Sequence, residues 1–378
     1  MSTPVKAYIG AKIHDGTDLH KKHALIIYEG GDCSVVSSND VPQGCEVEVL
    51  PGGVISPGFV DLQVNGGGGV MFNDEQSVDA LRTIANAHAL TGTAALLPTL
   101  ITDTAERTRA AIDAVEQAIR ENVPGIVGLH LEGPHLSVAR KGAHDPQLIR
   151  QMSEDDLARL LDAAQRLPNL KVTVAPENTT PDQIGAMVEA GVIVSLGHTD
   201  AGFDTCMAAF EAGASCVTHL FNAMSQLGNR EPGLVGAALA RDDVYAGLIA
   251  DGIHVHPSTI RIALDAKSDP SKVFLVTDAM ATIGSAIDCF SINGRDVFKM
   301  DSRLTLADGT LAGADLEMPR AISVMIDDVG DDLCHAIARS TSTPASLLRN
   351  CGDLGKLSSV ACGINYSSDC FTADIRRL

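Results

Sequence analysis

The chain has 378 residues, of which 45% are hydrophobic and 20% are charged, so it can bury a large core. This composition excludes a disordered, collagen-like or coiled-coil protein. The 28 basic and 48 acidic residues give a net charge of −20, which disfavours nucleic acid and anionic membranes as partners.

Targeting signals and cysteine usage indicate the compartment. Residues 1–6 lack the apolar core of a secretory signal, and no run approaches the roughly 18 apolar residues that a membrane span needs. The nine cysteines are scattered from Cys33 to Cys370 without a C-x-x-C pair, which is typical of reduced thiols rather than a disulfide framework. We therefore expect a cytoplasmic protein with no membrane partner.

The first fifty residues have the pattern of short strands. Residues 7–13 and 24–28 are apolar runs between turn residues, and residues 46–50 begin with a strict alternation of polar and apolar side chains that ends at Leu50. This alternation is typical of strands that are half buried.

The pattern changes from residue 54 onward to an alternation of apolar runs and amphipathic stretches. Eight apolar runs occur, at residues 54–64, 93–97, 126–131, 171–175, 192–196, 215–218, 245–250 and 273–277. Amphipathic stretches between them include residues 77–90, 104–121, 154–167 and 181–190. This order predicts parallel strands with right-handed helical crossovers, and eight such units predict a closed (β/α)₈ barrel. An open doubly wound sheet is the alternative.

Residues after the last run turn β-like again. Strand patterns at 296–300 and 303–306 precede a helical segment at 320–350, and residues 359–374 have weak strand character. The simplest organisation has two domains. A small discontinuous β-domain consists of residues 1–53 and 350–378, and the barrel spans residues 54–349.

Polar side chains follow six of the eight predicted strands, where a barrel of this type carries its reactive groups. They lie in residues 61–65, 130–135, 197–200, 218–222, 251–254 and 277–278. Ionisable groups in such apolar surroundings are unfavourable unless they are paired or bind a metal.

Three of these side chains form a ligand set. Glu132, His198 and His219 supply a carboxylate and two imidazoles, the usual set for a catalytic zinc with an open position for water. Such a metal lowers the pKa of its water and polarises a carbonyl oxygen. Asp278, at the end of the last strand, is placed to act as general base and acid. The pattern predicts hydrolysis of an amide-like bond by a metal-activated water.

Two other features have more ordinary interpretations. His130 lies two residues before Glu132, so both side chains point to the same side of the strand. It is a possible ligand, but we expect it to be buried and hydrogen-bonded. The glycine run at 66–69 lacks the spacing of a nucleotide-binding loop and is better explained by a bulge or turn.

Several segments resemble the N-acetylglucosamine-6-phosphate deacetylase family within the amidohydrolase superfamily. They are PGFVD through NG at 57–66, HLEGP at 130–134, KGAH at 141–144, GHT at 197–199, THLFNAM at 218–224, REPG at 230–233, DGIH at 251–254 and VTDA at 276–279. They occur in the family's order between about residues 50 and 320. The combination of HLEGP, THLFNAM and REPG is highly specific.

The resemblance implies a barrel with a small β-sandwich, usually as a homodimer. It implies hydrolysis of N-acetyl-D-glucosamine 6-phosphate to D-glucosamine 6-phosphate and acetate in amino-sugar catabolism and recycling. Glu132, His198 and His219 match the family's metal ligands, and Asp278 matches its catalytic acid/base. Ten further residues match its substrate-contacting positions: Ala143, His144, Asn222, Ala223, Arg230, Asp251, His254, Leu311, Ala312 and Gly313.

The chemistry of these residues suits an amino-sugar phosphate. Arg230 offers a planar fork of donors for phosphate, against the alternative of an ion pair with Glu231. His254 is expected to add a donor, and the resemblance implies that it reaches across the dimer interface. His144 is expected to donate to the acetyl carbonyl or a sugar hydroxyl and to stabilise developing negative charge.

Two departures from the superfamily pattern are informative. Many amidohydrolases carry H-x-H after the first strand, where this chain has Gln63 and Asn65. Neutral amides are poor zinc ligands, so we predict one divalent metal per chain. Zn²⁺ suits the set best, and Fe²⁺, Mn²⁺ or Co²⁺ could substitute. Residues 359–365 also lack the family's Gly-Lys pair before an apolar strand, which leaves the closing strand of the sandwich undecided.

Two competing functions can be distinguished from the deacetylase. Another metal amidohydrolase, such as a dihydroorotase or a deaminase, would not depend on Arg230 for a phosphate. A catalytically inactive sensor of amino-sugar phosphates would have no need of a proton-transferring group at Asp278.

Overall fold

The computed structural model describes residues 3–357, 361–367 and 370–372. Its centre is an eight-stranded parallel sheet in the order β17-β16-β15-β14-β13-β12-β11-β8. The strands are β8 (Phe59–Val64), β11 (Thr93–Ile101), β12 (Leu129–Glu132), β13 (Leu170–Val174), β14 (Ile193–Leu196), β15 (Cys216–Val217), β16 (Tyr245–Leu248) and β17 (Val273–Leu275). Each coincides with one of the eight predicted apolar runs.

The two edges of this sheet meet beyond β17. A parallel bridge joins Val64 to Ala279, and the backbone N–H of Asp278 donates to the carbonyl oxygen of Gln63 at 3.0 Å. These contacts nearly close the sheet into a cylinder. The predicted (β/α)₈ barrel is therefore confirmed, and the open doubly wound sheet is excluded.

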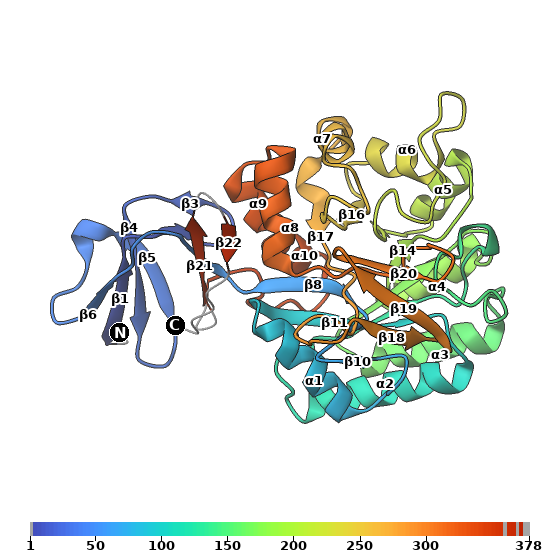
Figure 1. Ribbon diagram of the computed structural model, residues 1–378, viewed down its shortest axis with the longest axis horizontal. Helices are drawn as coiled ribbons and strands as arrows, with labels where there is room; N and C mark the ends of the chain where they lie inside the picture. The colour runs from blue at the N-terminus through green and yellow to red at the C-terminus, as the bar shows by residue number, and fades with distance from the viewer. Residues whose placement is uncertain (1–2, 358–360, 368–369, 373–378) are drawn as a thin grey trace.

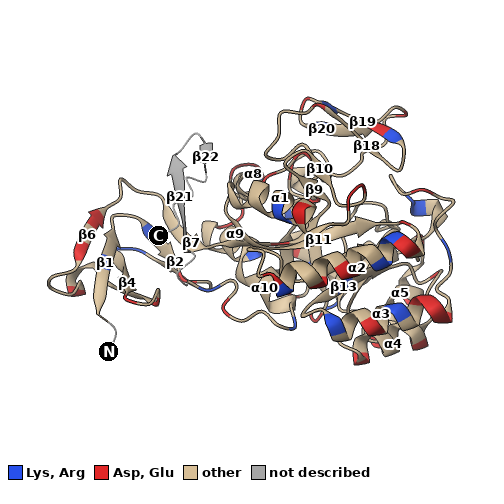
Figure 2. Cartoon of the chain, turned by 90° about the horizontal axis from the view of Figure 1, so that it is seen from below, with Lys and Arg blue, Asp and Glu red and all other residues tan. Residues whose placement is uncertain are grey.

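Helices surround the barrel (Figure 1). They are α1 (Val78–Ala89), α2 (Ala105–Arg120), α3 (Glu154–Arg166), α4 (Pro181–Glu189), α5 (Phe203–Glu211), α6 (Gly233–Ala240), α7 (Pro257–Ala266), α8 (Met318–Val324), α9 (Leu333–Ser340) and α10 (Ser342–Leu347). A π-helical turn, η4 (Met325–Val329), follows α8, and short 3₁₀ turns are η1 (Ser38–Asp40), η2 (Val138–Arg140) and η3 (Pro270–Lys272). Charged residues of both signs mark the outer helices α2 and α3 (Figure 2).

Local sequence signals fix where the helices begin. The Ser153 hydroxyl accepts from the backbone N–H of Asp156, whose carboxylate accepts in turn from the backbone N–H of Ser153. Thr180 and Gln183 form the same reciprocal arrangement at α4. Such capping boxes satisfy backbone donors that the first helical turn leaves free.

A small β-domain lies at one end of the molecule, beside the barrel (Figure 1). One sheet has the order β5-β4-β1-β6 and the other β22-β21-β7-β2-β3. The strands are β1 (Pro4–Ile9), β2 (Lys12–His14), β3 (Leu19–His20), β4 (His23–Tyr28), β5 (Cys33–Ser37), β6 (Glu46–Val49), β7 (Val54–Pro57), β21 (Ala361–Ser367) and β22 (Cys370–Thr372). The closing strand that the sequence left undecided is present, because β21 pairs antiparallel with β7.

The single strand expected at residues 54–64 is in fact two strands. β7 pairs with β2 and β21 in the small domain, whereas β8 begins the barrel after Gly58. An unbroken apolar run hides the change of sheet, because both strands are buried. The division into two domains stays a prediction, with β7 on the small-domain side.

Two small β-structures lie near the barrel mouth. The glycine run forms a hairpin of β9 (Gly66–Gly67) and β10 (Val70–Met71), with Gly68 and Gly69 at positive φ between them. This confirms the turn expected there. A separate antiparallel sheet contains β18 (Cys289–Ile292), β19 (Arg295–Met300) and β20 (Arg303–Leu306).

The core is apolar between sheet and helices but polar inside the barrel. Phe59, Leu96 and Phe274 belong to the main apolar cluster, while Asp61 and Lys171 are fully buried. Among the described residues, no helix combines the length and apolar character that crossing a membrane requires.

Candidate active site

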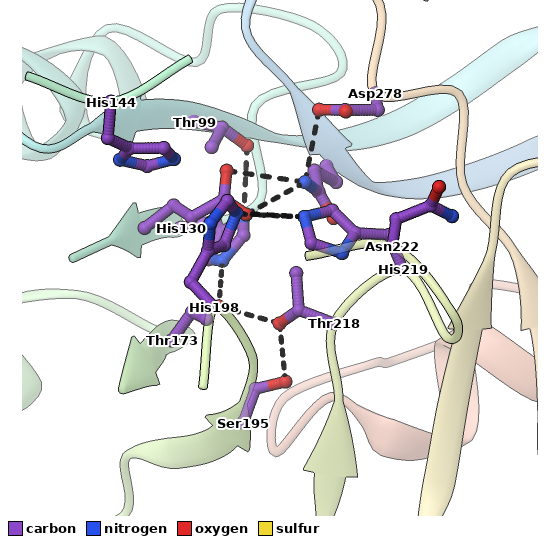
Figure 3. A network of polar contacts seen from close by, with 12 residues as sticks. Thr99, His130, His144, Thr173, Ser195, His198, Thr218, His219, Asn222 and Asp278 are labelled. Atoms are coloured by element: carbon purple, nitrogen blue, oxygen red, sulfur yellow. Dashed lines mark hydrogen bonds and ion pairs between the residues drawn. The ribbon is translucent and has the colours of Figure 1, made fainter. Parts of the chain in front are cut away.

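The three predicted metal ligands come together at the barrel mouth. Glu132 ends β12, His198 follows β14 and His219 follows β15. Oε1 of Glu132 lies 3.3 Å from Nε2 of His198 and 3.0 Å from Nε2 of His219. The two Nε2 atoms are 3.1 Å apart (Figure 3). All three side chains are buried.

This geometry fits one small divalent cation. Tetrahedral zinc holds nitrogen and oxygen ligands at about 2.0–2.2 Å, which places neighbouring ligand atoms about 3.3 Å apart. The observed separations of 3.0–3.3 Å are close to that value. Within the described residues, no other group of three such side chains meets the same geometric test.

Hydrogen bonding prepares His198 to bind a cation. Its Nδ1 lies 2.8 Å from the carbonyl oxygen of Arg140. A carbonyl only accepts, so Nδ1 carries the proton and Nε2 has a free lone pair directed at the cluster. The Nδ1 of His219 is buried and has no partner among the described residues.

The backbone beneath these side chains is unusual. His198, His219 and Asp278 have φ values of 48°, 34° and 51°. Residues other than glycine seldom adopt this left-handed conformation, which clusters at functional sites where the surrounding structure holds it in place. Here it occurs at three strand ends on the same face of the barrel.

The protonation state of Glu132 suits metal binding. Burial acts to raise the pKa of Glu132, but the close contacts of its carboxylate with the His198 and His219 rings bring it well below its usual range. Burial acts to lower the pKa of His219, and the bond to Glu132 raises it overall. The cluster thus holds an ionised carboxylate, the form that binds a cation.

Asp278 lies beside the cluster and is anchored through one oxygen. Its Oδ1 accepts from Nε2 of Gln63 at 3.0 Å and from Nδ2 of Asn65 at 2.7 Å. Gln63 also approaches both oxygens of Glu132 at 3.3 Å. Burial and the charge of Glu132 raise the pKa of Asp278. The two amides that replace the H-x-H pair therefore act as donors to carboxylates.

A cavity of about 350 Å³ opens over this centre. Most of the predicted site residues line it: Glu132, Ala143, His144, His198, His219, Asn222, Ala223, His254, Asp278, Leu311 and Gly313. Arg140 also lines it, and its Nε donates to Oδ1 of Asp200 at 2.8 Å. The sequence reasoning missed Arg140, although its position next to the KGAH segment was a usable signal.

Three predicted substrate residues do not line the cavity. Asp251 lies behind it and holds His254 through a 2.6 Å contact between its Oδ2 and the ring Nδ1. Ala312 is fully buried. Arg230 is exposed and lies outside the cavity in the single chain.

His130 has the buried, hydrogen-bonded role expected for it. Its Nδ1 lies 3.1 Å from Oγ1 of Thr99 and its Nε2 lies 2.7 Å from Oγ1 of Thr173. The network continues to Thr218 and Ser195 through contacts of 2.7 Å (Figure 3). Both ring nitrogens are occupied, so His130 is not a ligand.

Comparisons with known proteins identify the family of this chain. The sequence model of the amidohydrolase family matches residues 54–358. The N-acetylgalactosamine-6-phosphate deacetylase of Shewanella sp. (strain ANA-3) is 42% identical, over 90% of this chain and 86% of that protein. The N-acetylglucosamine-6-phosphate deacetylase of Haemophilus influenzae is 35% identical, over 90% and 88%. A crystal structure of N-acetylglucosamine-6-phosphate deacetylase from Pasteurella multocida superposes with a TM-score of 0.91 at 34% identity, covering 98% of both chains.

Proposed function

Because this chain belongs to the amidohydrolase family, we propose that it hydrolyses N-acetyl-D-glucosamine 6-phosphate to D-glucosamine 6-phosphate and acetate. The observation that carries the proposal is the juxtaposition of Glu132, His198 and His219 with Asp278 in one cavity. The similarity to amino-sugar-phosphate deacetylases over 90% of the chain supports the substrate class.

One divalent cation per chain is part of this proposal. When bound at Glu132, His198 and His219, such an ion acidifies a water molecule and polarises a carbonyl oxygen. Zn²⁺ fits the ligand set best, and Fe²⁺, Mn²⁺ or Co²⁺ could substitute. Gln63 and Asn65 direct their NH₂ groups at carboxylates, and their amide oxygens are poor zinc ligands, which supports a single ion.

Asp278 is proposed to move the protons. With Oδ1 held by two amides, Oδ2 is the oxygen left for the reactants. It accepts a proton from the attacking water and delivers it to the amine as the C–N bond breaks. A pKa raised by burial and by the Glu132 charge suits both transfers.

The remaining cavity residues are proposed to recognise the sugar phosphate. His144 donates to the acetyl carbonyl or a sugar hydroxyl. The phosphate end is assigned to His254 as a hydrogen-bond donor, with Arg140 as a cation in the cavity wall. The proposed phosphate contact of Arg230 rests on the resemblance alone, because this side chain lies outside the cavity of one chain.

A second candidate substrate is N-acetyl-D-galactosamine 6-phosphate, the C4 epimer. It is favoured by the 42% identity to an N-acetylgalactosamine-6-phosphate deacetylase. The two epimers carry the same acetamido group and the same phosphate, so the metal ligands and Asp278 serve either substrate. A homodimer in the cytoplasm stays a prediction for both.

The test is acetate release by the purified, zinc-loaded protein from both 6-phosphates and from the same two sugars without phosphate. We expect rapid release from at least one phosphorylated sugar and much slower release from its unphosphorylated counterpart. Equal rates with and without phosphate would overturn the substrate assignment. Absence of acetate from all four sugars would overturn the proposed activity, and ammonia release would indicate a deaminase instead.

A further inference from the structure

The ring of His144 is held by Thr102 in a way that determines where its proton lies. The backbone N–H of Thr102 donates to Nδ1 of His144 at 3.3 Å, and Oγ1 of Thr102 lies 2.7 Å from the same atom. An amide N–H can only donate, so Nδ1 must present its lone pair. A hydroxyl can supply a second proton to the same lone pair, which reinforces the acceptor role.

The other ring nitrogen then carries the proton. A neutral imidazole with an acceptor at Nδ1 has its N–H at Nε2, since each nitrogen's role is set by the bond that the other makes. His144 lines the cavity, and no described residue bonds to its Nε2. This nitrogen is therefore an N–H donor available to a ligand oxygen.

His198 has the opposite arrangement. Its Nδ1 faces the carbonyl oxygen of Arg140, so its proton is on Nδ1 and its lone pair is on Nε2. The rings of His144 and His198 lie edge to face with centroids 4.4 Å apart. The Nε2 atoms of these two neighbouring histidines thus have different roles: that of His198 has a lone pair, and that of His144 is an N–H donor.

The fold makes room for Thr102 at this position. Thr102 directly follows β11 and is 1% exposed. Its Oγ1 also lies 3.4 Å from the carbonyl oxygen of Glu132, and Nδ1 of His144, at 2.7 Å, is the better acceptor for the single hydroxyl proton. A Cβ on Gly133 would lie only 2.2 Å from that hydroxyl oxygen, and Gly133 has a φ of 88°. The glycine of the HLEGP segment is thus required for the approach of Thr102.

We propose that Thr102 is a positioning residue that fixes His144 as the Nε2–H tautomer and thereby creates a hydrogen-bond donor for the substrate. The identity of the acceptor, an acetyl carbonyl or sugar hydroxyl oxygen, rests on the proposed function. The tautomer itself follows from contacts within the chain.

The first experiment compares Thr102→Val with Thr102→Ser. Valine keeps the shape and loses the hydroxyl, whereas serine keeps the hydroxyl. We expect kcat to fall about tenfold in Thr102→Val, the order of one net hydrogen bond, with KM and zinc content little changed. Thr102→Ser should recover most of the loss. Wild-type kcat in Thr102→Val would overturn the positioning role of the Thr102 hydroxyl, because valine keeps the backbone N–H that also donates to Nδ1.

The second experiment reads the tautomer directly and needs no variant of Thr102. Zinc-loaded wild-type protein labelled with ¹⁵N-histidine is examined by two-bond ¹H–¹⁵N correlation, and His144→Gln assigns the His144 signals. A protonated Nε2 and a lone-pair Nδ1 are expected. A proton on Nδ1 would overturn the inference.

Two amide replacements of His144 give an independent readout. The Gln amide nitrogen reaches the position of Nε2, whereas the Asn amide nitrogen reaches that of Nδ1. His144→Gln should therefore keep more activity than His144→Asn, and the reverse order would contradict the assignment. Failure of the proposed function is distinguishable, because a protein that releases no acetate still reports its tautomer in the ¹⁵N spectrum.

Discussion

Replacement of Asp278 by Asn separates the proton-transferring role that we propose for this residue from its structural one. Oδ1 of Asp278 accepts both amide hydrogen bonds, from Gln63 and from Asn65. An asparagine carbonyl can occupy the same position and accept both bonds, with its NH₂ group in place of Oδ2. Asparagine also tolerates the left-handed backbone, here with φ of 51°. The variant should therefore fold and keep its cavity.

The magnitude follows from what the amide cannot do. An amide at the Oδ2 position neither accepts a proton from water nor delivers one to an amine. General acid–base catalysis contributes about 10²–10⁴-fold, or roughly 2.7–5.5 kcal/mol of barrier. Stability should not fall, because the exchange removes a buried carboxyl whose ionisation burial and the Glu132 charge disfavour. The variant should therefore lose turnover while its unfolding temperature does not fall.

The assay measures acetate release at saturating substrate, metal content by elemental analysis and thermal unfolding. Asp182→Asn, the same exchange at an exposed residue of α4, is the matched control and should leave turnover unchanged. We expect Asp278→Asn to lose at least a hundredfold in kcat with wild-type metal content. Turnover within tenfold of wild type, at full metal content, would remove Asp278 from the proton transfers.

Three further outcomes are expected. Arg140→Gln should raise KM for the phosphorylated sugar about tenfold or more, the order of a charge-assisted hydrogen bond. An unchanged KM in Arg140→Gln would exclude a contact between Arg140 and the phosphate. Arg230→Gln should raise KM only if Arg230 reaches the phosphate from outside the cavity of one chain. Elemental analysis should find about one metal per chain, and two tightly bound metals would contradict the single site. Removal of the metal by a chelator should lower the unfolding temperature, and one equivalent of Zn²⁺ should restore it. Burial lowers the pKa of His135 from 6.5 to about 4. Between pH 7 and pH 5 the unfolded chain therefore binds a proton at this residue that the folded chain excludes. The free energy of unfolding should fall by about 2 kcal/mol over that range from this group alone. His135→Asn, which can still donate to the Arg150 carbonyl, should reduce that fall in denaturant unfolding, and an unchanged pH response would contradict it.

Most of the barrel could be predicted because its signal is local. Strands buried on both faces are runs of apolar residues, and amphipathic helices separate them, so each unit is visible within about thirty residues. The exception at residues 54–64 has a clear cause. β7 and β8 are both buried and differ only in the sheets that they join, which a periodicity cannot reveal.

The grouping of Glu132, His198 and His219 was also predictable, because strand topology alone brings strand ends together. Glu132, His198 and His219 needed only the rule that reactive groups follow barrel strands. The residues that line the cavity wall could not be predicted in the same way. Arg140 and Arg230 both lie outside the strands, and only three-dimensional packing decides that the first lines the cavity and the second does not.

Contacts between side chains distant in sequence were beyond the sequence signal. Thr102 and His144 are 42 residues apart, and Gln63 reaches Asp278 across 215 residues. Nothing in the sequence around Thr102 or Gln63 indicates that its partner is His144 or Asp278. At Gln63 and Asn65 the sequence showed only that the histidine pair is missing. It did not show that the two amides donate hydrogen bonds to carboxylates.

The closing contacts of the barrel have a consequence for how this protein can lose activity. Glu132 ends β12, and His198 and His219 follow β14 and β15, all inside the sheet, whereas Asp278 sits on the seam, where its N–H bonds to Gln63 and the next residue bridges to Val64. Loosening of that seam by heat or by a substitution there would displace Asp278 and leave Glu132, His198 and His219 grouped. A damaged or partly folded chain could thus sequester an ion while being inert as a hydrolase.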